Sequence, residues 1–403
     1  MIKRNLINTA FDEEFGKQMR FIIGPRQCGK TTAAKWFLQK YNCQNLYYNW
    51  DNRHVRDRYI EDNHFFSRDI YNVNSSWNKP VLCLDEIHKY PKWKNILKDF
   101  YDSFCNELLF IVTGSARLDM MRKSGDSLAG RYFTFRLNPF ILQEFSTGNF
   151  HEPFESAQKW INNKLEKPIY RKNELEALLT FSGYPEPLIS GSDRFHRKWQ
   201  TDYMDRLIRE DLREITNFQE MENLAILMKL LPDKVSSPLS INSLTNDLKS
   251  SFQTVSNYLN ALELGYLIFR VPSYSKKIAR SIKKEKKVYF YDWTRISNIG
   301  SRFENYVACE LKAITELWTD AGLGNYSLYY VKNRDGKESD FLIVKDDTPY
   351  LLIEVKLSRT NIEYHHKKNS QILNVPFIQI VREEGIAEIS DKHCQMSASR
   401  FFS

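Results

Sequence analysis

Two glycines, a lysine and a threonine near the N-terminus have the spacing of a phosphate-binding loop. The segment GPRQCGKT at 24–31 satisfies the pattern G-x-x-x-x-G-K-[ST]. In that pattern backbone N–H groups surround phosphate oxygens, the lysine reaches the β- and γ-phosphates, and the hydroxyl ligates Mg²⁺. The apolar run MRFII precedes the loop and a helical pattern follows it, which is the context this chemistry requires. The residues expected to line the site are Gly24, Pro25, Arg26, Gln27, Cys28, Gly29, Lys30, Thr31 and Thr32, with Cys28 contributing its backbone.

An acidic pair follows a second apolar run, VLCLDE at 81–86. The run delivers Asp85 to the carboxyl end of a strand, where it can hold Mg²⁺ through water. Glu86 is then placed to polarise an attacking water, and this pair favours an ATPase over a kinase or a GTPase switch. The alternative is an exposed acidic turn after a strand.

A third apolar run, LLFIVTGSAR, ends in Thr113, Gly114 and Ser115. We expect its strand to lie between the first two, so that Ser115 could sense the γ-phosphate. Arg117 and Arg131 are the nearest cations able to neutralise charge that develops in phosphoryl transfer. Either arginine could equally be a structural ion-pair partner.

Carboxylates also stand in two apolar runs near the C-terminus, in GKESDFLIVKDDTPYLLIEVK at 336–356. Residues i and i+2 of a strand share a face, so Glu354 and Lys356 project together. The turn-forming KDDTP allows antiparallel pairing, which would bring Asp340 close to Glu354. Converging carboxylates favour a divalent cation, Mg²⁺ or alternatively Mn²⁺, with Glu304 as a further acidic member and Lys356 orienting water. The alternative is a hairpin with solvated acidic ends.

The elements that must position these groups fall into four predicted segments. Residues 1–145 alternate apolar strands with amphipathic helices, which predicts an α/β domain with a mostly parallel sheet. Residues 146–235 are predominantly helical and form a predicted lid. Residues 236–287 read as helix, turn, helix, strand and basic wing, the layout of a winged helix. Residues 288–403 predict a further α/β domain.

Cations are concentrated in SKKIARSIKKEKK at 275–287, which suggests contact with a nucleic-acid backbone. The predicted second helix at 252–264 opens with residues that suit a DNA groove, among them Gln253 and Asn257. The alternatives are a solvated loop and a small packing module. The residues expected to contact DNA are Lys276, Lys277, Arg280, Lys283, Lys284, Lys286 and Lys287.

Composition is ordinary for a soluble globular protein: 403 residues, 42% hydrophobic, 27% charged, net charge +8. No apolar run has the length of a membrane span, and no apolar stretch follows the first basic residues as in a secretory signal. The six cysteines lie far apart without a CxxC pair, so we expect reduced thiols in a cytoplasmic protein.

The chain resembles a prokaryotic family of AAA-type P-loop ATPases with a C-terminal restriction-endonuclease-like domain of unknown function. The resemblance covers nearly the whole chain. It lies in GPRQCGKTT, YYNWD, LDEIHKYPKW, VTGSAR, SLAGR at 127–131, LNPFILQEF, SGYPEPL at 182–188, LIREDL at 207–212, VYFYD, RFENYVACEL and ESDFLI with LIEVK. It implies that the loop, acidic strand and sensor strand serve ATP binding and hydrolysis. One departure is YFYDWTRI, where the family usually shows an aspartate, a small residue and a glycine.

Together these features predict a Mg²⁺-dependent ATPase that acts on DNA through a winged helix and a nuclease-like domain. Nucleases of the restriction type place an aspartate on one strand and Glu-x-Lys on the next, as Asp340, Glu354 and Lys356 do. An alternative is an ATP-gated switch whose last domain is catalytically inert and only binds DNA or protein. A third possibility is a signalling ATPase that never touches nucleic acid. Oligomeric state is left open.

Overall fold

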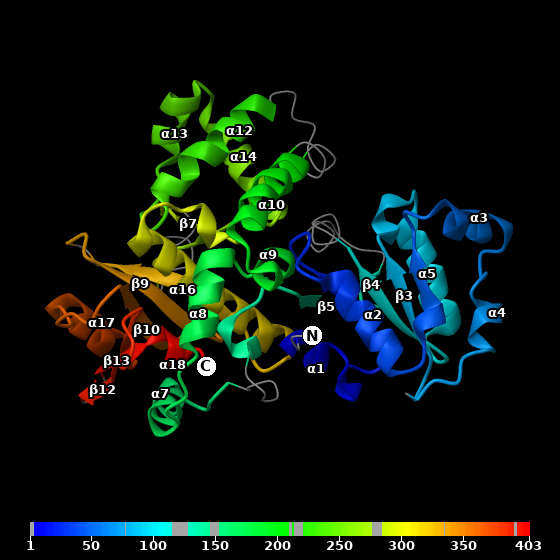
Figure 1. Ribbon diagram of the computed structural model, residues 1–403, viewed down its shortest axis with the longest axis horizontal. Coiled ribbons are helices and arrows are strands. Elements are labelled where there is room, and N and C mark those ends of the chain that lie inside the picture. The colour runs from blue at the N-terminus through cyan, green and yellow to red at the C-terminus, as the bar shows by residue number, and fades with distance from the viewer. Residues whose placement is uncertain are drawn as a thin grey trace. The chain divides into compact units, whose positions relative to one another are not determined.

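A computed structural model describes residues 4–76, 78–114, 128–145, 153–208, 212, 221–275, 284–333, 335–390 and 393–403. The chain divides into two compact units, with the boundary between Asn138 and Pro139. Figure 1 labels the elements of both.

The first unit is built on a five-stranded sheet in the order β2-β3-β4-β1-β5, and all four pairings are parallel. The prediction that the strand of LLFIVTG lies between the other two is confirmed, because β4 pairs with both β1 and β3. The strands are β1 (Met19–Ile23), β2 (Tyr47–Asn49), β3 (Val81–Asp85), β4 (Leu109–Thr113) and β5 (Tyr132–Arg136). The helices are α1 (Asn5–Ala10), η1 (Glu13–Phe15), α2 (Lys30–Lys40), η2 (Gln44–Leu46), α3 (Arg53–Glu61), α4 (Ser67–Ile70), η3 (Ile87–Lys89) and α5 (Trp93–Phe104).

Burial explains why these strands pair in parallel. Every residue of β1, β3 and β4 is buried, as expected for strands that are covered on both faces by crossover helices. In α5 the buried residues Ile96, Leu97, Phe100 and Tyr101 recur at helical spacing and form the face that packs inward. Because the strands run the same way, the carboxyl ends of β1, β3 and β4 meet at one edge of the sheet.

The second unit begins with a helical region. Its elements are η5 (Leu142–Phe145), α7 (Ala157–Glu166), α8 (Lys172–Phe181), α9 (Pro185–Ser190), α10 (Asp193–Arg206), α12 (Met221–Leu230), η7 (Leu231–Lys234), α13 (Ile241–Leu248) and α14 (Phe252–Leu264). A short break separates two of these helices: α8 ends at Phe181, and α9 begins at Pro185, because proline suits the first turn of a helix.

An antiparallel hairpin of β6 (Ile268–Val271) and β7 (Lys287–Phe290) follows α14. The backbone of Lys287 also forms a bridge to Pro238, which precedes α13. The predicted boundary after residue 287 therefore falls inside a strand of this hairpin.

The rest of the unit is a mixed six-stranded sheet in the order β12-β13-β11-β10-β9-β8. The predicted antiparallel pairing of the two acidic runs is confirmed, with Ile353 opposite Phe341. Asp346 and Asp347 form the turn with φ of 47° and 62°. The strands are β8 (Tyr326–Lys332), β9 (Glu338–Lys345), β10 (Thr348–Lys356), β11 (Phe377–Val381), β12 (Ala387–Ser390) and β13 (His393–Ser397), and the remaining helices are η8 (Trp293–Arg295), α16 (Ile299–Asp320), α17 (Tyr364–Leu373) and α18 (Ala398–Phe401).

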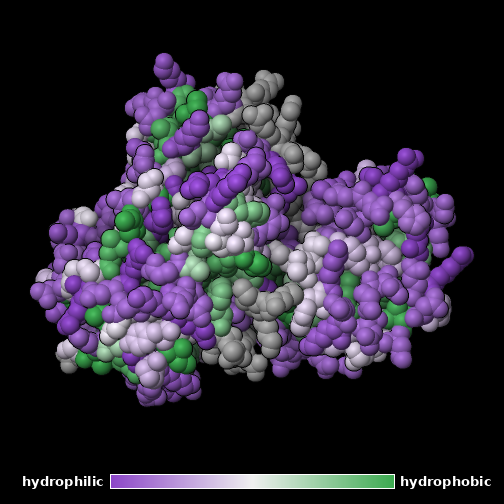
Figure 2. All heavy atoms as spheres, in the orientation of Figure 1, coloured by the Kyte–Doolittle hydropathy of each residue, from purple (hydrophilic) through white to green (hydrophobic). Residues whose placement is uncertain are grey.

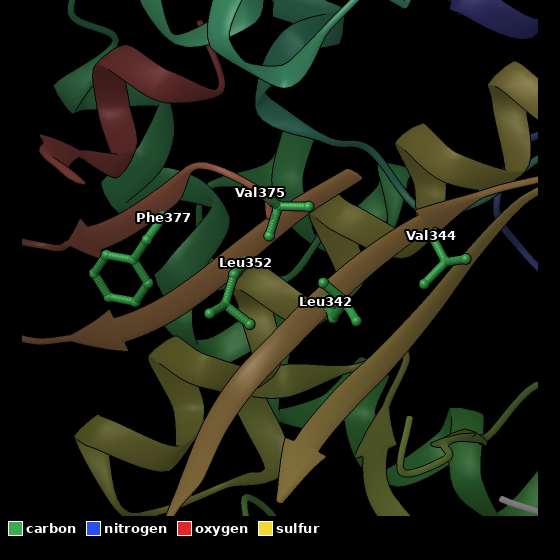
Figure 3. Packing of buried hydrophobic residues seen from close by; sticks show 5 residues of the cluster. All are labelled: Leu342, Val344, Leu352, Val375 and Phe377. Atoms are coloured by element: carbon green, nitrogen blue, oxygen red, sulfur yellow. The ribbon is translucent and has the colours of Figure 1, made fainter. Parts of the chain in front are cut away.

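One apolar cluster lies on β9, β10 and the segment entering β11 (Figure 3). It consists of Leu342, Val344, Leu352, Val375 and Phe377, each nearly inaccessible to solvent. Leu342 and Leu352 stand opposite each other across the β9–β10 pair. Because side chains two apart share a face, this cluster leads along both strands toward Asp340 and Glu354.

The visible surface is mostly hydrophilic, with hydrophobic residues in small separate groups (Figure 2). Among the described helices, none combines the length and apolar character needed to cross a membrane.

A buried carboxyl group anchors the start of the second unit. Glu310, in the middle of α16, accepts hydrogen bonds from the backbone N–H of Leu142 at 2.6 Å and from the hydroxyl of Tyr306 at 2.6 Å. Its side chain is fully inaccessible, and burial raises its pKa to about 8. The carboxyl group is therefore mostly protonated at neutral pH.

This raised pKa predicts a pH-dependent stability. A group whose pKa is raised by folding stabilises the fold below its unfolded pKa, and that contribution is lost as pH rises toward the folded value. We expect the free energy of unfolding to fall with a slope of about 1.4 kcal/mol per pH unit from this group between roughly pH 5 and 8. Denaturant unfolding of Glu310→Gln should lack this part of the slope, whereas the exposed substitution Glu388→Gln should keep it. An unchanged slope in Glu310→Gln would contradict the assignment.

Candidate functional site

The loop between β1 and α2 is shaped by a glycine that no other residue could replace. Gly24 has φ of 144°, and a Cβ atom on it would lie 2.2 Å from the carbonyl oxygen of Leu137. Leu137 follows β5 and donates its N–H to Ile23 at 2.8 Å, so the end of β5 holds the loop entrance. Gly29, with φ of 97°, then starts α2. The backbone therefore turns sharply from strand to helix, as phosphate binding requires.

Lys30 points back into this loop. Its Nζ donates to the carbonyl oxygens of Gly24 at 3.0 Å and Pro25 at 2.6 Å, and the side chain is buried. A buried ammonium group that rests on neutral carbonyls is well suited to pair with an anion at the loop. The structure thus brings Lys30, the loop backbone and the first turn of α2 together.

Two side chains brace the loop from behind, and one of them, Arg4, was not singled out by the sequence. The guanidinium of Arg4 donates to the carbonyl oxygen of Cys28 at 2.9 Å and also to that of Asn138. The thiol of Cys28 is buried and lies 3.2 Å from the oxygen of Leu137. No motif contains Arg4, so only the folded chain reveals its position.

Asp85 is the centre of a hydroxyl network at the carboxyl edge of the sheet. Its Oδ2 accepts from the Thr31 hydroxyl at 2.9 Å and from the Tyr47 hydroxyl at 2.5 Å, and its Oδ1 accepts from Thr113. Burial, together with the hydrogen bond to Asp85, raises the pKa of Tyr47, so this phenol remains a donor at any working pH. Three elements, α2, β2 and β4, therefore orient one carboxylate.

These residues fit the Mg²⁺ ion that such a loop implies. A hydroxyl and a carboxylate, the hard oxygen ligands that Mg²⁺ prefers, already lie 2.9 Å apart in Thr31 and Asp85. When bound, the ion would neutralise phosphate charge, and Thr31 and Asp85 would hold it.

Glu86 follows Asp85 in an unusual backbone conformation. Its φ is 58°, in the left-handed region that costs a residue with a side chain about 1 kcal/mol. Its Oε2 lies 3.4 Å from Nε2 of the buried His88 and 3.6 Å from Nζ of Lys89. Burial raises the pKa of Glu86, and the charge of Lys89 opposes that rise. The strained turn directs this carboxyl group beside Asp85 without continuing β3.

Three residues were expected to contact the γ-phosphate or neutralise its charge: Ser115, Arg117 and Arg131. Of these, the structure describes Arg131. Arg131 precedes β5, whose first residue pairs with Met19 at the start of β1. That position is the amino edge of the sheet, opposite the loop, and Arg131 there makes two bonds to Asp102, at 2.7 and 3.0 Å. The fold therefore does not bring Arg131 to the loop within its own unit. Ser115, like Arg117, lies outside the described residues.

In the second unit the acidic residues predicted to converge do so. The backbone N–H of Asp340 donates to Glu354 Oε2 at 3.3 Å, and the N–H of Val355 donates to Asp340 Oδ2 at 3.0 Å. Glu304, from α16, accepts from the Tyr289 hydroxyl at 2.8 Å. Burial, followed by the charge of Asp340, raises the pKa of both Glu304 and Glu354, and the charges of Lys287 and Lys356 oppose that rise. Within the described part of the chain, no group of three or more His, Cys, Asp and Glu side chains is arranged to hold a metal ion.

Lys287 enters this cluster, and its predicted contact with DNA is wrong. The side chain is 1% exposed, and its Nζ lies 3.1 Å from Asp340, 3.4 Å from Glu304 and 3.7 Å from Glu338. Burial lowers the pKa of Lys287, but the charges of Glu304 and Asp340 outweigh that effect and the net pKa is raised. The lysine is therefore charged and turned inward, away from solvent.

Two more side chains complete the cluster. Lys356 donates to Glu354 Oε1 at 2.6 Å. The buried His366, on α17, lies 3.6 Å from the same oxygen, and its Nδ1 is 2.9 Å from the Ser339 hydroxyl. Burial lowers the pKa of His366 to about 4, so the imidazole is neutral near pH 7. No sequence motif contains this histidine, because α17 reaches the cluster only in the folded sheet.

The remaining basic residues are only partly described. Lys284 is exposed and Lys286 is half-buried. Lys276, Lys277, Arg280 and Lys283 lie outside the described residues. In the helix predicted to face DNA, Gln253 donates to Asn257 at 2.9 Å on an exposed surface of α14.

Comparison with known proteins identifies parts of the chain. Residues 16–146 match the family model described as "AAA domain". Residues 172–294 and 299–396 match two domains of unknown function, DUF8612 and DUF4143. An uncharacterized protein of Methanocaldococcus jannaschii is 25% identical over 85% of this chain and 76% of its own length. An uncharacterized protein of Haemophilus influenzae is 23% identical over 82% of this chain and 80% of its own.

A comparison of structures found AMPPCP-bound DnaA from Aquifex aeolicus, with 16% identity and a TM-score of 0.29 over 61% of this chain and 81% of that chain. A score this low establishes no common architecture. The match of residues 16–146 to an AAA domain agrees with the parallel sheet and the phosphate-binding loop that these residues form.

The network around Asp85 predicts a role for Tyr47. Tyr47→Phe removes one hydrogen bond to a charged group, roughly 1.5 kcal/mol, and should raise the Mg²⁺ concentration for half-maximal nucleotide binding about tenfold. Fluorescent nucleotide binding titrated with Mg²⁺ measures this. Tyr48→Phe is the matched control, because the hydroxyl of Tyr48 donates to Asp69 at 2.7 Å instead of to Asp85. Equal Mg²⁺ dependence in the two variants would contradict this role.

Proposed function

We propose that the first unit binds and hydrolyses ATP with Mg²⁺. The observation that supports this most strongly is the convergence of Lys30, Thr31, Asp85 and Glu86 at one edge of a parallel sheet. Lys30 and Thr31 follow β1, Asp85 ends β3 and Glu86 follows it, and these two parallel strands end at the same edge of the sheet. The match to an AAA domain supports the same reaction.

Each residue has a distinct role in this proposal. The loop backbone and Lys30 bind the β- and γ-phosphates, and Lys30 exchanges the carbonyls of Gly24 and Pro25 for phosphate oxygens. Thr31 and Asp85 hold the ion. Glu86 accepts a proton from the attacking water, and its raised pKa suits a proton acceptor near neutrality.

Substitution separates binding from hydrolysis. Lys30→Ala should abolish ATP binding, because the loop loses the buried ammonium group that would pair with the β- and γ-phosphates. Glu86→Gln should retain binding while hydrolysis falls by about two to three orders of magnitude, as expected for loss of a general base. Lys40→Ala, at the exposed end of α2, is the control. Hydrolysis by Glu86→Gln at the wild-type rate would refute the assigned base.

For the second unit we propose a DNA-binding role. The order of α12, α13, α14 and the β6–β7 hairpin, with the bridge at Pro238, supports a winged-helix interpretation. The order α16, β8, β9, β10, α17 and β11, with acids on β9 and β10, supports a restriction-endonuclease-like interpretation.

A specific observation favours the inert alternative for the last domain. Both oxygens of Asp340 and both of Glu354 already accept hydrogen bonds from the protein. A cluster that satisfies its own acceptors has no need of a metal ion. We therefore favour an ATP-gated DNA-binding switch over a nuclease.

Two of the described basic residues, Lys284 (exposed) and Lys286 (half-buried), provide the test of DNA binding. Reversing both charges in Lys284→Glu/Lys286→Glu should weaken binding to duplex DNA and reduce the slope of log K against log salt by about 2. Lys367→Glu/Lys368→Glu, on the exposed face of α17, is a control with the same change in net charge. Stimulation of ATP hydrolysis by DNA, measured on the same variants, shows whether the two units work together. Identical salt slopes for both double variants would exclude this segment as a phosphate contact.

A further inference from the structure

The carboxylate cluster of the second unit disagrees with the metal ion that a restriction-endonuclease-like domain implies. Such a site needs open carboxylate oxygens that face a common point. Here Asp340 Oδ2 accepts from the Val355 N–H at 3.0 Å, and Glu354 Oε2 accepts from the Asp340 N–H at 3.3 Å. Both bonds run from a backbone N–H of one strand to a carboxylate of the other, so contacts between β9 and β10 occupy one oxygen of each acid.

Ammonium groups take the other two oxygens. Lys356 lies 2.6 Å from Glu354 Oε1, and Lys287 lies 3.1 Å from Asp340 Oδ1. Lys287 also reaches Glu304 at 3.4 Å and Glu338 at 3.7 Å. One buried cation thus contacts acids from α16 and from two positions of β9, which is the set of groups a bridging ion would join.

Because Lys287 is buried, its contacts with these acids differ from those of a surface ion pair. Isolated lysines are almost never fully buried, because desolvating an unpaired ammonium group costs several kcal/mol. At 1% exposure, the charge of Lys287 is compensated by the carboxylates that contact it, and its Nζ lies over the ring of Tyr330 at 5.6 Å. The acids and the lysine therefore depend on each other.

We propose that Lys287 is the resident cation of the C-terminal carboxylate cluster and excludes a divalent metal from it. This rests on the proposed non-cleaving role of the second unit and supplies its physical basis. An ammonium group and a divalent ion cannot both occupy the space between Asp340 and Glu304, because their repulsion in a buried site is large. The ion pairs of Lys287 then connect the β6–β7 hairpin to the six-stranded sheet, and we call this connection the joint.

The experiment replaces the lysine with an uncharged side chain of similar length. In Lys287→Met, Asp340 Oδ1 and Glu304 lose their cation, so we expect Mn²⁺ to bind at least about tenfold more tightly than to the wild type. Mn²⁺ binding is followed by electron paramagnetic resonance without nucleotide and is compared with the wild type, which has the same Thr31 and Asp85. The melting temperature of Lys287→Met should rise with Mn²⁺ and fall with EDTA, whereas that of the wild type should respond to neither.

Lys332→Met is the matched control. Lys332 pairs with Glu338 at 2.8 Å but is 40% exposed, so its removal takes away a lysine from the same acid without emptying the cluster. It should behave as the wild type in both measurements. If Lys287→Met does not fold, the double variant Lys287→Met/Glu304→Gln restores the charge balance and should fold without metal.

Two results would overturn the proposal. They are Mn²⁺ binding by Lys287→Met that is no tighter than that of the wild type, and failure of the double variant to recover stability when Lys287→Met is unfolded. None of these measurements involves ATP, so a first unit that fails to hydrolyse ATP would leave this proposal standing, and the reverse also holds.

Discussion

The parallel register of β1, β4 and β3 is the constraint on which the nucleotide site depends. Ile22 lies opposite Thr113, and Thr113 lies opposite Asp85. This row of paired residues determines where the loops after β1, β4 and β3 begin. A shift of a single residue would turn Asp85 to the other face. The hydroxyl groups of Thr31, Tyr47 and Thr113 then fix the carboxylate in that row. The position of the Asp85 carboxylate is thus determined by the register of the sheet more than by the phosphate-binding loop.

The two units use a buried lysine in contrasting ways. Lys30 rests on neutral carbonyl oxygens, which bind a cation weakly enough to be exchanged for phosphate. Lys287 rests on carboxylates, which hold it far more strongly. The same side chain is therefore available to a ligand in one place and committed to the fold in the other, and the difference lies in the formal charge of its partners.

Much of the fold could be predicted because its signals are local. The all-apolar strands, the phosphate-loop pattern and the hairpin turn at Asp346 and Asp347 each depend on a few adjacent residues. Helix α14 was also predicted with its observed bounds. The contributions of Arg4, Tyr47 and His366 were missed, because each acts through residues that are distant in sequence. Lys287 was misassigned for a related reason: it ends a run of cations, and charge patterning does not distinguish the last exposed residue from the first residue of a buried strand.

Lys287 stabilises the fold through both its backbone and its side chain, and this limits how the second unit can be cut into fragments. Its backbone bridges to Pro238 and pairs with β6, while its side chain neutralises acids on α16 and β9. A fragment beginning at Val288 would contain those acids without their cation, and uncompensated buried charges cost several kcal/mol each. Protease cleavage within the hairpin segment before Lys287 would leave the joint intact, but cleavage directly after it would detach the cation. Any autonomous fragment of the C-terminal sheet must therefore include β7.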